Sequence, residues 1–515
     1  MSRYEHATAA VNARWIVSAG VLFALFFVTL FALAAGRGLN IDEHGFVATG
    51  ALLLREGSLP FRDYPWFHTP NLTFLYALTF SLSDHLLLSA RVVSVICTWI
   101  MLVLIAAVAS RQLASSPPRS RWLLSLGAAL LLFSNPLTRY TCWRAWNHPA
   151  AVLLATGAVV CLWRGAAATR GRWWFFFGGL LVALAIGTRL TVAPLAFGLL
   201  AMTLLAPREL SLRERTMRAV ALCAGSFVGA LPTLWIFAAA PEAFVFGVFT
   251  WHGPVSQLFR AETDGAEEIT LASRLLFLLR EVLSNPGNLA LLLLFVALQV
   301  AAFRQHAGKI ARDFPNLLVL VAIGCALAGA LAPATPYHQH YYALVPLLVL
   351  GLLPPLRLLH QRTPLRWGVA VAAAVSLAST WHDYKHLKRI ASPAEWTPIK
   401  IHTAGQQLAT LAPRGRVLTV APITALEGRL RIYPAFATGH FAWRTAPFIA
   451  HQQRHAFGFV GPDELSTLLA AEAAAAVCTG NIKAPEEAFL EYANSIRYQP
   501  HALADGGTAW VAAQQ

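Results

Sequence analysis

The sequence predicts an α-helical membrane protein with about 11 spanning helices, followed by a small α/β domain. Two properties of the composition support this class. Of the 515 residues, 57% are hydrophobic and only 13% are charged, and the mean hydropathy is +0.55. Soluble domains carry about twice that share of charged residues. The third observation is that apolar runs of about 20 residues recur along the chain, each long enough to cross a hydrocarbon core.

One apolar stretch, Trp173–Leu205, is too long for a single span, because one helix over it would measure about 50 Å. Gly187, Thr188 and Arg189 interrupt it, so we expect two helices joined by a tight turn. The segment Leu271–Leu283 is apolar but short, and is expected to be interfacial or to extend the next helix. The expected spans, in chain order, lie at 15–35, 86–110, 122–134, 149–163, two within 173–205, 219–239, 286–303, 315–333, 340–356 and 366–381.

The basic residues concentrate in connections on one side of these spans. With the N-terminus on that side, the positive-inside rule predicts a multi-pass protein of the plasma (inner) membrane whose N-terminus is cytoplasmic. The net charge of +15 then needs no nucleic-acid partner. The first run, Trp15–Ala35, is expected to stay as an anchor. The basic connections are 111–121, 164–172, 207–218, 304–313 and 357–366; the opposite side receives 37–85, 135–148 and 241–269.

The character of the chain changes after Trp381. We expect a membrane domain at 1–384 and a soluble, extracytoplasmic α/β domain at 385–515, with a polar linker between them. The expected strands are Arg416–Ala421, Ala475–Cys478 and Ala509–Ala512, and the expected helix is Pro462–Glu472. The six cysteines form no disulfide framework or metal-binding spacing.

Charge is concentrated in the first outer loop, at residues 37–85, and above all in Leu39–Tyr76. Asn40 is expected to cap a short helix that Gly57 ends. Asp42 lies in its first turn, next to a predicted span and in water-accessible space, where a carboxylate can act as a general base. Glu43 has two alternative roles, a catalytic one beside Asp42 or a structural one in which it hydrogen-bonds back to the capping residue.

Three segments together resemble a known family. The stretch LPFRDYPWFHTPNLTFL at 59–75, the turn GTRLT at 187–191 and YHQHYYALVP at 337–346 are similar to patterns of the GT-C glycosyltransferases, in the branch of protein mannosyltransferases and lipid A aminoarabinose transferases. An Asp-Glu pair just after the first helix also fits that branch. The resemblance implies a donor sugar on a polyprenyl phosphate and an acceptor hydroxyl outside the cytoplasm, with inversion at the sugar.

By the same resemblance, Asp42 is the general base, and a cationic group binds the donor phosphate, because guanidinium groups pair with phosphate bidentately. The candidates for phosphate binding are Arg62, Arg189, His338 and His340; Arg139, Arg144 and His148 are weaker ones on the same side. Alternatives stay open: Arg189 can snorkel from a helix end, and His338, His340 and His252 can be interfacial anchors. Asp63 is expected to hold the loop through Arg62 or Arg55. No metal or cofactor is expected.

Two other functions are compatible with a polytopic chain. A transporter or flippase of a lipid-linked saccharide would carry ionisable residues within its spans, whereas here Asp, Glu and Lys are nearly absent from them. A non-catalytic partner in polysaccharide assembly would explain the soluble tail but not the charged first loop. The sequence therefore favours a glycosyltransferase with partners limited to the lipid-linked donor, membrane lipids and an acceptor, which is a lipid, a glycan or a protein.

Overall fold

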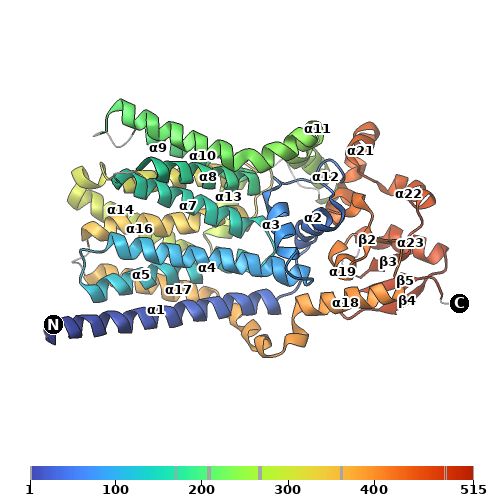
Figure 1. Cartoon of the computed structure of the whole chain (residues 1–515), viewed down its shortest axis with the longest axis horizontal. Coiled ribbons are helices and arrows are strands. Elements are labelled where there is room, and N and C mark those ends of the chain that lie inside the picture. The colour runs from blue at the N-terminus through green and yellow to red at the C-terminus, as the bar shows by residue number, and fades with distance from the viewer. Residues whose placement is uncertain are drawn as a thin grey trace.

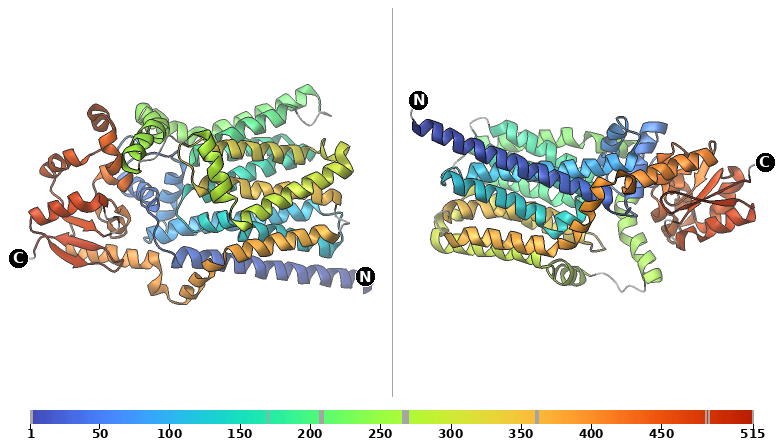
Figure 2. Two further views of the ribbon diagram at one scale, coloured as in Figure 1. Left: turned by 180° about the vertical axis from the view of Figure 1, so that it is seen from behind. Right: turned by 90° about the horizontal axis from the view of Figure 1, so that it is seen from below.

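The computed structural model describes residues 3–168, 171–205, 210–264, 270–359, 363–480, 482 and 484–513. Long helices run side by side along the longest axis of the molecule (Figure 1). A C-terminal α/β unit sits at one end of this bundle and the N-terminus lies at the other (Figures 1 and 2). The predicted class, a polytopic helical membrane protein with a small C-terminal α/β part, is confirmed.

Eight helices within the described residues are long and apolar enough to cross a membrane. The count of about 11 is not confirmed, because α5 (Pro118–Ser134), α17 (Thr363–Ser379) and the segment Leu190–Leu205 fall short of that length. The eight are Val17–Gly36 within α1 (Arg3–Gly36), α4 (Leu86–Gln112), α7 (Asn147–Ala167), α8 (Gly171–Thr188), α10 (Leu212–Ala239), α14 (Pro286–Ile310), α15 (Phe314–Leu331), and His338–Leu359, which joins η4 (His338–Ala343) to α16 (Leu344–Leu359).

The long apolar stretch is broken where the sequence predicts it. Helix α8 ends at Thr188, Arg189 is extended with φ −154°, and η1 (Leu190–Val192) leads into α9 (Ala193–Leu205). This break places Arg189 at the end of the bundle that carries the C-terminal part, between two apolar helices. A further short helix, α6 (Pro136–Thr141), lies at the same end between α5 and α7.

The first loop, residues 37–85, forms a layer over that end of the bundle. It contains α2 (Glu43–Glu56) and α3 (Asn71–Phe80). Gly57 ends α2 with φ 66°, a left-handed conformation that glycine adopts without the penalty of a side chain. The predicted short helix and its glycine stop are therefore confirmed, although the helix begins at Glu43.

The connection between α10 and α14 is helical and packs against the first loop. Its stretches η2 and η3 have π-helical hydrogen bonding. The Trp251 ring in η2 stacks on Phe67 of the first loop with centroids 3.8 Å apart. The elements are α11 (Pro241–Val245), η2 (Phe246–Val255), α12 (Ser256–Asp264), α13 (Leu271–Phe277) and η3 (Leu278–Val282).

The C-terminal part is built on a five-stranded sheet in the order β2-β1-β3-β5-β4. Strand β1 pairs in parallel with β2 and β3, while β5 is antiparallel to β3 and β4. The three predicted strands correspond to β1 (Arg416–Leu418), β3 (Ala476–Thr479) and β5 (Thr508–Val511). The sequence did not predict β2 (Arg431–Ile432), which has two residues, or β4 (Gln499–Ala502), which is polar and contains a proline.

Helices surround this sheet and link it to the membrane bundle. The linker folds as η5 (Trp381–Ala391) and η6 (Pro393–Glu395), and η5 packs beside α1. The predicted helix at Pro462–Glu472 is formed by η9 and α22. The remaining elements are α18 (Thr397–Leu411), α19 (Pro422–Glu427), η7 (Pro434–Phe436), α20 (His440–Thr445), η8 (Ala446–Phe448), α21 (His451–Phe457), η9 (Pro462–Glu464), α22 (Leu465–Ala471), η10 (Ala484–Glu486) and α23 (Glu487–Ser495).

The C-terminal part docks on the membrane helices through both polar and apolar contacts. Glu427 of α19 accepts a hydrogen bond from the Leu87 N–H at the start of α4, at 2.8 Å. A carboxylate is favourable at a helix N-terminus because it satisfies an unpaired amide and complements the helix dipole. Arg429 forms a second link with Asp84 at 2.6 Å. One apolar core runs across the junction and includes residues of α2, α4, α19 and the sheet.

Candidate functional site

Asp42 lies at the end of the connection between α1 and α2, beneath the C-terminal part. The residue is mostly buried. Burial raises the pKa of Asp42 to about 6; the guanidinium groups of Arg144, Arg189 and Arg444 oppose that rise, and Glu43 adds to it. Asp42 is therefore ionised at neutral pH but holds a proton more tightly than an exposed aspartate, which suits a group that must accept a proton.

Glu43, the neighbour of Asp42, is fully buried, and both of its carboxylate oxygens accept hydrogen bonds. Its carboxylate forms an ion pair with Arg91 at 2.7 Å, and the backbone N–H groups of Asn40 and Ala145 each donate to it at 2.8 Å. Arg91 donates its other hydrogen bonds to backbone carbonyls near the end of α1. Those acceptors are Ala34, Arg37 and Gly38, at 2.8 to 2.9 Å. This network fixes the turn that carries Asp42 and leaves Glu43 without a free lone pair for catalysis.

Arg189 is held by polar contacts that join four helices. Its Nη1 donates to Asn147 Oδ1 at 3.1 Å, and Asn147 in turn donates to the Thr188 carbonyl at 3.1 Å. Asn71 of α3 donates to the Leu184 carbonyl at 3.2 Å and accepts from Thr233 of α10 at 3.0 Å. Burial lowers the pKa of Arg189 to about 10, so its guanidinium stays charged at neutral pH.

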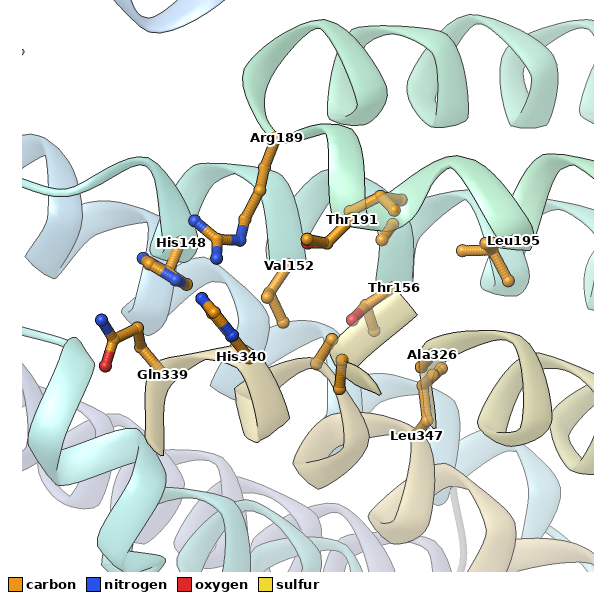
Figure 3. A pocket seen from close by; sticks show the side chains of 14 residues that line it. His148, Val152, Thr156, Arg189, Thr191, Leu195, Ala326, Gln339, His340 and Leu347 are labelled. Carbon is orange, nitrogen blue, oxygen red and sulfur yellow. The ribbon is translucent and has the colours of Figure 1, made fainter. Parts of the chain in front are cut away.

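A pocket opens directly beside Arg189. Figure 3 shows the guanidinium group facing the rings of His148 and His340, with Gln339 on the opposite wall. Both ring nitrogens of His148 and Nδ1 of His340 are buried without a hydrogen-bond partner. The rest of the lining is apolar or small, and includes Val152, Thr156, Leu195, Ala326 and Leu347. The pocket thus combines a cationic, donor-rich end with apolar walls between membrane helices, which suits an anionic group attached to a hydrocarbon chain.

Two more histidines continue this polar cluster towards the first loop. The rings of His68 and His252 are 5.3 Å apart, and His252 Nε2 is 2.5 Å from the Phe67 carbonyl. Burial lowers the pKa of His252 to about 4 and holds the pKa of His68 well below its usual value. Both are neutral at pH 7. Within the described ranges, no three His, Cys, Asp or Glu side chains are arranged to hold a metal ion.

Other predicted site residues lie away from this pocket. Arg62 is exposed and forms a bidentate pair with Asp63 at 2.7 and 2.9 Å. Asp63 also accepts from the Leu59 N–H at 2.7 Å, so the pair organises the loop. The His338 ring packs between Tyr140 and Phe277, with centroids 5.8 and 5.2 Å away. Neither Arg62 nor His338 lines the pocket, and their contacts favour the structural alternatives given above.

The structure brings to the site three residues that the sequence left unassigned or only weakly assigned. Arg91 lies inside an apolar helix, where a charged residue signals a buried partner. His148 lies at the start of α7 and is a weak candidate from the sequence. Arg444 lies in the C-terminal part, far along the chain, and no local pattern links it to Asp42. Docking of the C-terminal part brings Arg444 within electrostatic range of Asp42, and the spacing of the two residues in the sequence does not predict this.

The arrangement of these helices, with the first loop and the C-terminal part over the same end, is similar to the fold of GT-C glycosyltransferases of known structure. Among solved structures, the chain is similar to ArnT from Cupriavidus metallidurans bound to undecaprenyl phosphate, with a TM-score of 0.63, 14% identity, and coverage of 96% of this chain and 99% of that one. The apo form of the same protein gives a TM-score of 0.62.

The archaeal oligosaccharyltransferase AglB from Archaeoglobus fulgidus, in complex with an inhibitory peptide and a dolichol-phosphate, is also similar. The TM-score is 0.51 and the identity 14%, over 98% of this chain and 75% of that one. No family profile and no curated protein sequence matches this chain. The likeness therefore concerns the fold and the multi-pass membrane architecture.

Proposed function

We propose that the protein is a membrane glycosyltransferase that transfers a sugar from a polyprenyl-phosphate donor to an acceptor hydroxyl. The observation that carries this proposal is the position of Arg189, whose charge acts on Asp42 and whose side chain lines the pocket of unpaired imidazoles. A proton acceptor thus lies within electrostatic range of Arg189, at the cationic end of a pocket with apolar walls that suits a lipid-linked anion. A transfer reaction needs both at one place, whereas a transport pathway does not need the base.

In the proposed reaction, Asp42 accepts the proton of the acceptor hydroxyl as its oxygen attacks the anomeric carbon. The bond between that carbon and the phosphate oxygen breaks, with inversion, and the electron pair leaves on the polyprenyl phosphate. Arg189, His148 and His340 stabilise the charge that develops on the phosphate. Such preorganised donors act strongly in a site from which water is excluded. Glu43 has a supporting role, since its oxygens are all engaged.

The similar folds support the choice of donor. ArnT was solved with undecaprenyl phosphate and AglB with a dolichol-phosphate, and both lipids present a phosphate on a long apolar chain. The pocket of this protein offers the complementary surfaces, because Arg189 and two imidazoles lie at one end and aliphatic side chains at the other. On this basis we propose that the protein works at the membrane face that carries its C-terminal part.

Binding of undecaprenyl phosphate to the purified protein in detergent tests the donor assignment. Wild type should bind it at least tenfold more tightly than undecaprenol, and Arg189→Met should lose about 10- to 100-fold, because a hydrogen bond to a charged group contributes about 1.5–3 kcal/mol. His338→Ala is the matched control, since His338 lies in the same segment but outside the pocket. Equal binding of the phosphate and the alcohol would refute the site.

Reconstitution with a polyprenyl-phosphate sugar tests the chemistry. Asp42→Asn should reduce transfer by about 10²- to 10⁴-fold, the usual contribution of a general base, while undecaprenyl phosphate binding is retained. An active preparation whose Asp42→Asn variant transfers sugar at the wild-type rate would remove Asp42 from the mechanism. Uptake of a lipid-linked saccharide without transfer would favour the transporter alternative.

A further inference from the structure

The segment that links the last membrane helix to the C-terminal part is a long 3₁₀ helix. Element η5 has 11 residues, whereas 3₁₀ runs longer than three or four residues are uncommon because their hydrogen-bond geometry is poor. It is separated from α17 only by Thr380 and projects beside the end of α1, between the bundle and α18 (Figure 1). A helix of this kind needs stabilising contacts from outside itself.

The sequence of η5 follows the period of its helix. Side chains three residues apart lie above one another in a 3₁₀ helix, so η5 presents three stripes. One stripe is apolar, one is basic, and the third carries the acidic residue of the helix. They consist of Trp381, Tyr384, Leu387 and Ile390; of His382, Lys385 and Lys388; and of Asp383, His386 and Arg389. Such a separation is typical of a helix that lies at the boundary between a membrane and water.

The third stripe fastens η5 to α1 at the level where a membrane span ends. Asp383 accepts a hydrogen bond from Arg37, and Arg389 Nη1 donates to the Gly36 carbonyl at 2.6 Å. Gly36 is the last residue of an apolar span. Element η5 therefore lies at the membrane boundary, at the end of the bundle that carries the C-terminal part.

The basic stripe faces outwards beside an exposed aromatic ring. His382, Lys385 and Lys388 are all exposed, and the Trp381 side chain is 70% exposed. The acid of η5, Asp383, is on another stripe and is engaged by Arg37. An indole ring next to lysines at the end of a span suits the zone of phospholipid headgroups, where indoles partition and ammonium groups meet phosphates.

The charge behind η5 is also positive. Arg139 of α6 is buried, and its guanidinium carbon lies 5.1 Å from the centroid of the Tyr384 ring. None of its three nitrogens has a hydrogen-bond partner among the described residues, and its Nε is 3.7 Å from Asp383. One carboxylate thus faces two guanidinium groups, those of Arg37 and Arg139. The junction of η5 with the bundle has an excess of positive charge that a nearby anion can offset.

We propose that η5 is a binding surface for anionic phospholipid headgroups of the surrounding membrane. Lys385 and Lys388 contact the headgroup phosphates and Trp381 inserts between the lipids, while Asp383 and Arg389 keep the helix on α1. The lipid contact fixes the linker, and with it the place of the C-terminal part over the candidate site. This inference does not depend on the transfer reaction.

The test is amide hydrogen exchange of η5 in the full chain, in nanodiscs of phosphatidylcholine alone or mixed with phosphatidylglycerol. Exchange should slow by up to about 25-fold with phosphatidylglycerol, because each lysine near an anionic headgroup contributes about fivefold and opening of the helix loses both contacts. Lys385→Gln/Lys388→Gln should lose this difference, and Lys385→Arg/Lys388→Arg should keep it. The matched control, Arg414→Gln/Arg497→Gln, removes the same charge from exposed positions of the C-terminal part and should also keep it.

Equal exchange of η5 in the two kinds of nanodisc would overturn the proposal, and so would a phosphatidylglycerol effect that survives in the Lys385→Gln/Lys388→Gln variant. Inorganic phosphate added to phosphatidylcholine nanodiscs distinguishes the source of the anion and should leave exchange unchanged. A slowing equal to that in phosphatidylglycerol would indicate a site for free phosphate in place of a lipid surface. Because both lysines are exposed, the glutamine variant should keep the wild-type unfolding midpoint; a lower midpoint would mean that the lysines support the fold itself, which also counts against the proposal.

Discussion

Replacing Asp42 by Asn should make the protein more stable at neutral pH while it strongly reduces the proposed activity. Burial raises the pKa of Asp42 from 3.8 to about 6, so the folded state holds the proton more tightly than the unfolded state does. Below about pH 4 the group is neutral in both states and has no effect. As the pH rises from about 4 to about 6, the folded protein loses about 1.36 kcal/mol of stability for each pH unit that separates the two pKa values, or about 3 kcal/mol in total.

The free energy of unfolding in mixed micelles, followed between pH 4 and 8, measures this cost. Asp42→Asn should exceed wild type by up to about 3 kcal/mol at pH 8, and the difference should vanish near pH 4. Asp63→Asn is the matched control. Because Arg62 holds the pKa of Asp63 below its usual range, loss of the Asp63 charge should lower the free energy of unfolding at neutral pH instead of raising it. An Asp42→Asn variant no more stable than wild type at pH 8 would refute the burial argument.

Three further substitutions probe the support of the site. Arg91→Met leaves Glu43 as a buried unpaired charge and should cost about 3–5 kcal/mol of unfolding free energy, much of which the double variant with Glu43→Gln should recover. Gly187→Ala drives a Cβ into the Asn71 side chain; it should weaken undecaprenyl phosphate binding by displacing the end of α8, and unaltered affinity would contradict that packing. Glu427→Ala uncaps α4 and should cost about 1–3 kcal/mol, measured as faster proteolysis of the linker; wild-type resistance would show the cap to be dispensable.

The membrane architecture was predictable because it depends on composition and length. Apolar runs locate most of the spans, and Gly187–Arg189 marks the break between α8 and the following helix. Strands β1, β3 and β5 were recognised because they are apolar and partly or wholly buried. The expected count of about 11 spans is not confirmed: eight helices in the described part of the chain reach the length of a crossing, while α5, α9 and α17 have 17, 13 and 17 residues.

The candidate site was only partly predictable, for a different reason. Asp42 and Arg189 follow from local signals, a charged turn after a span and a break within an apolar stretch. The role of Glu43 depends on Arg91, which lies in another helix, and a pairing at that distance has no local sequence signature. Arg62 was predicted to bind phosphate because it is a guanidinium group, but in the structure it pairs with its neighbour Asp63 at the surface. Spacing identifies residue types, whereas partners are set by tertiary packing.

The hydrogen bond between Glu427 and the Leu87 amide has a consequence for biosynthesis. Its two residues are 340 positions apart, so the ribosome adds 340 residues after Leu87 before the carboxylate that caps α4 exists. Until then the Leu87 amide at the start of α4 lacks its Glu427 acceptor. Arg91, one turn further along α4, pairs with Glu43 next to Asp42, so the turn that carries Asp42 depends on a helix whose first turn is not yet capped. A segment translated long after the first loop therefore completes the packing of that loop, and a chain truncated before residue 427 lacks this cap on α4.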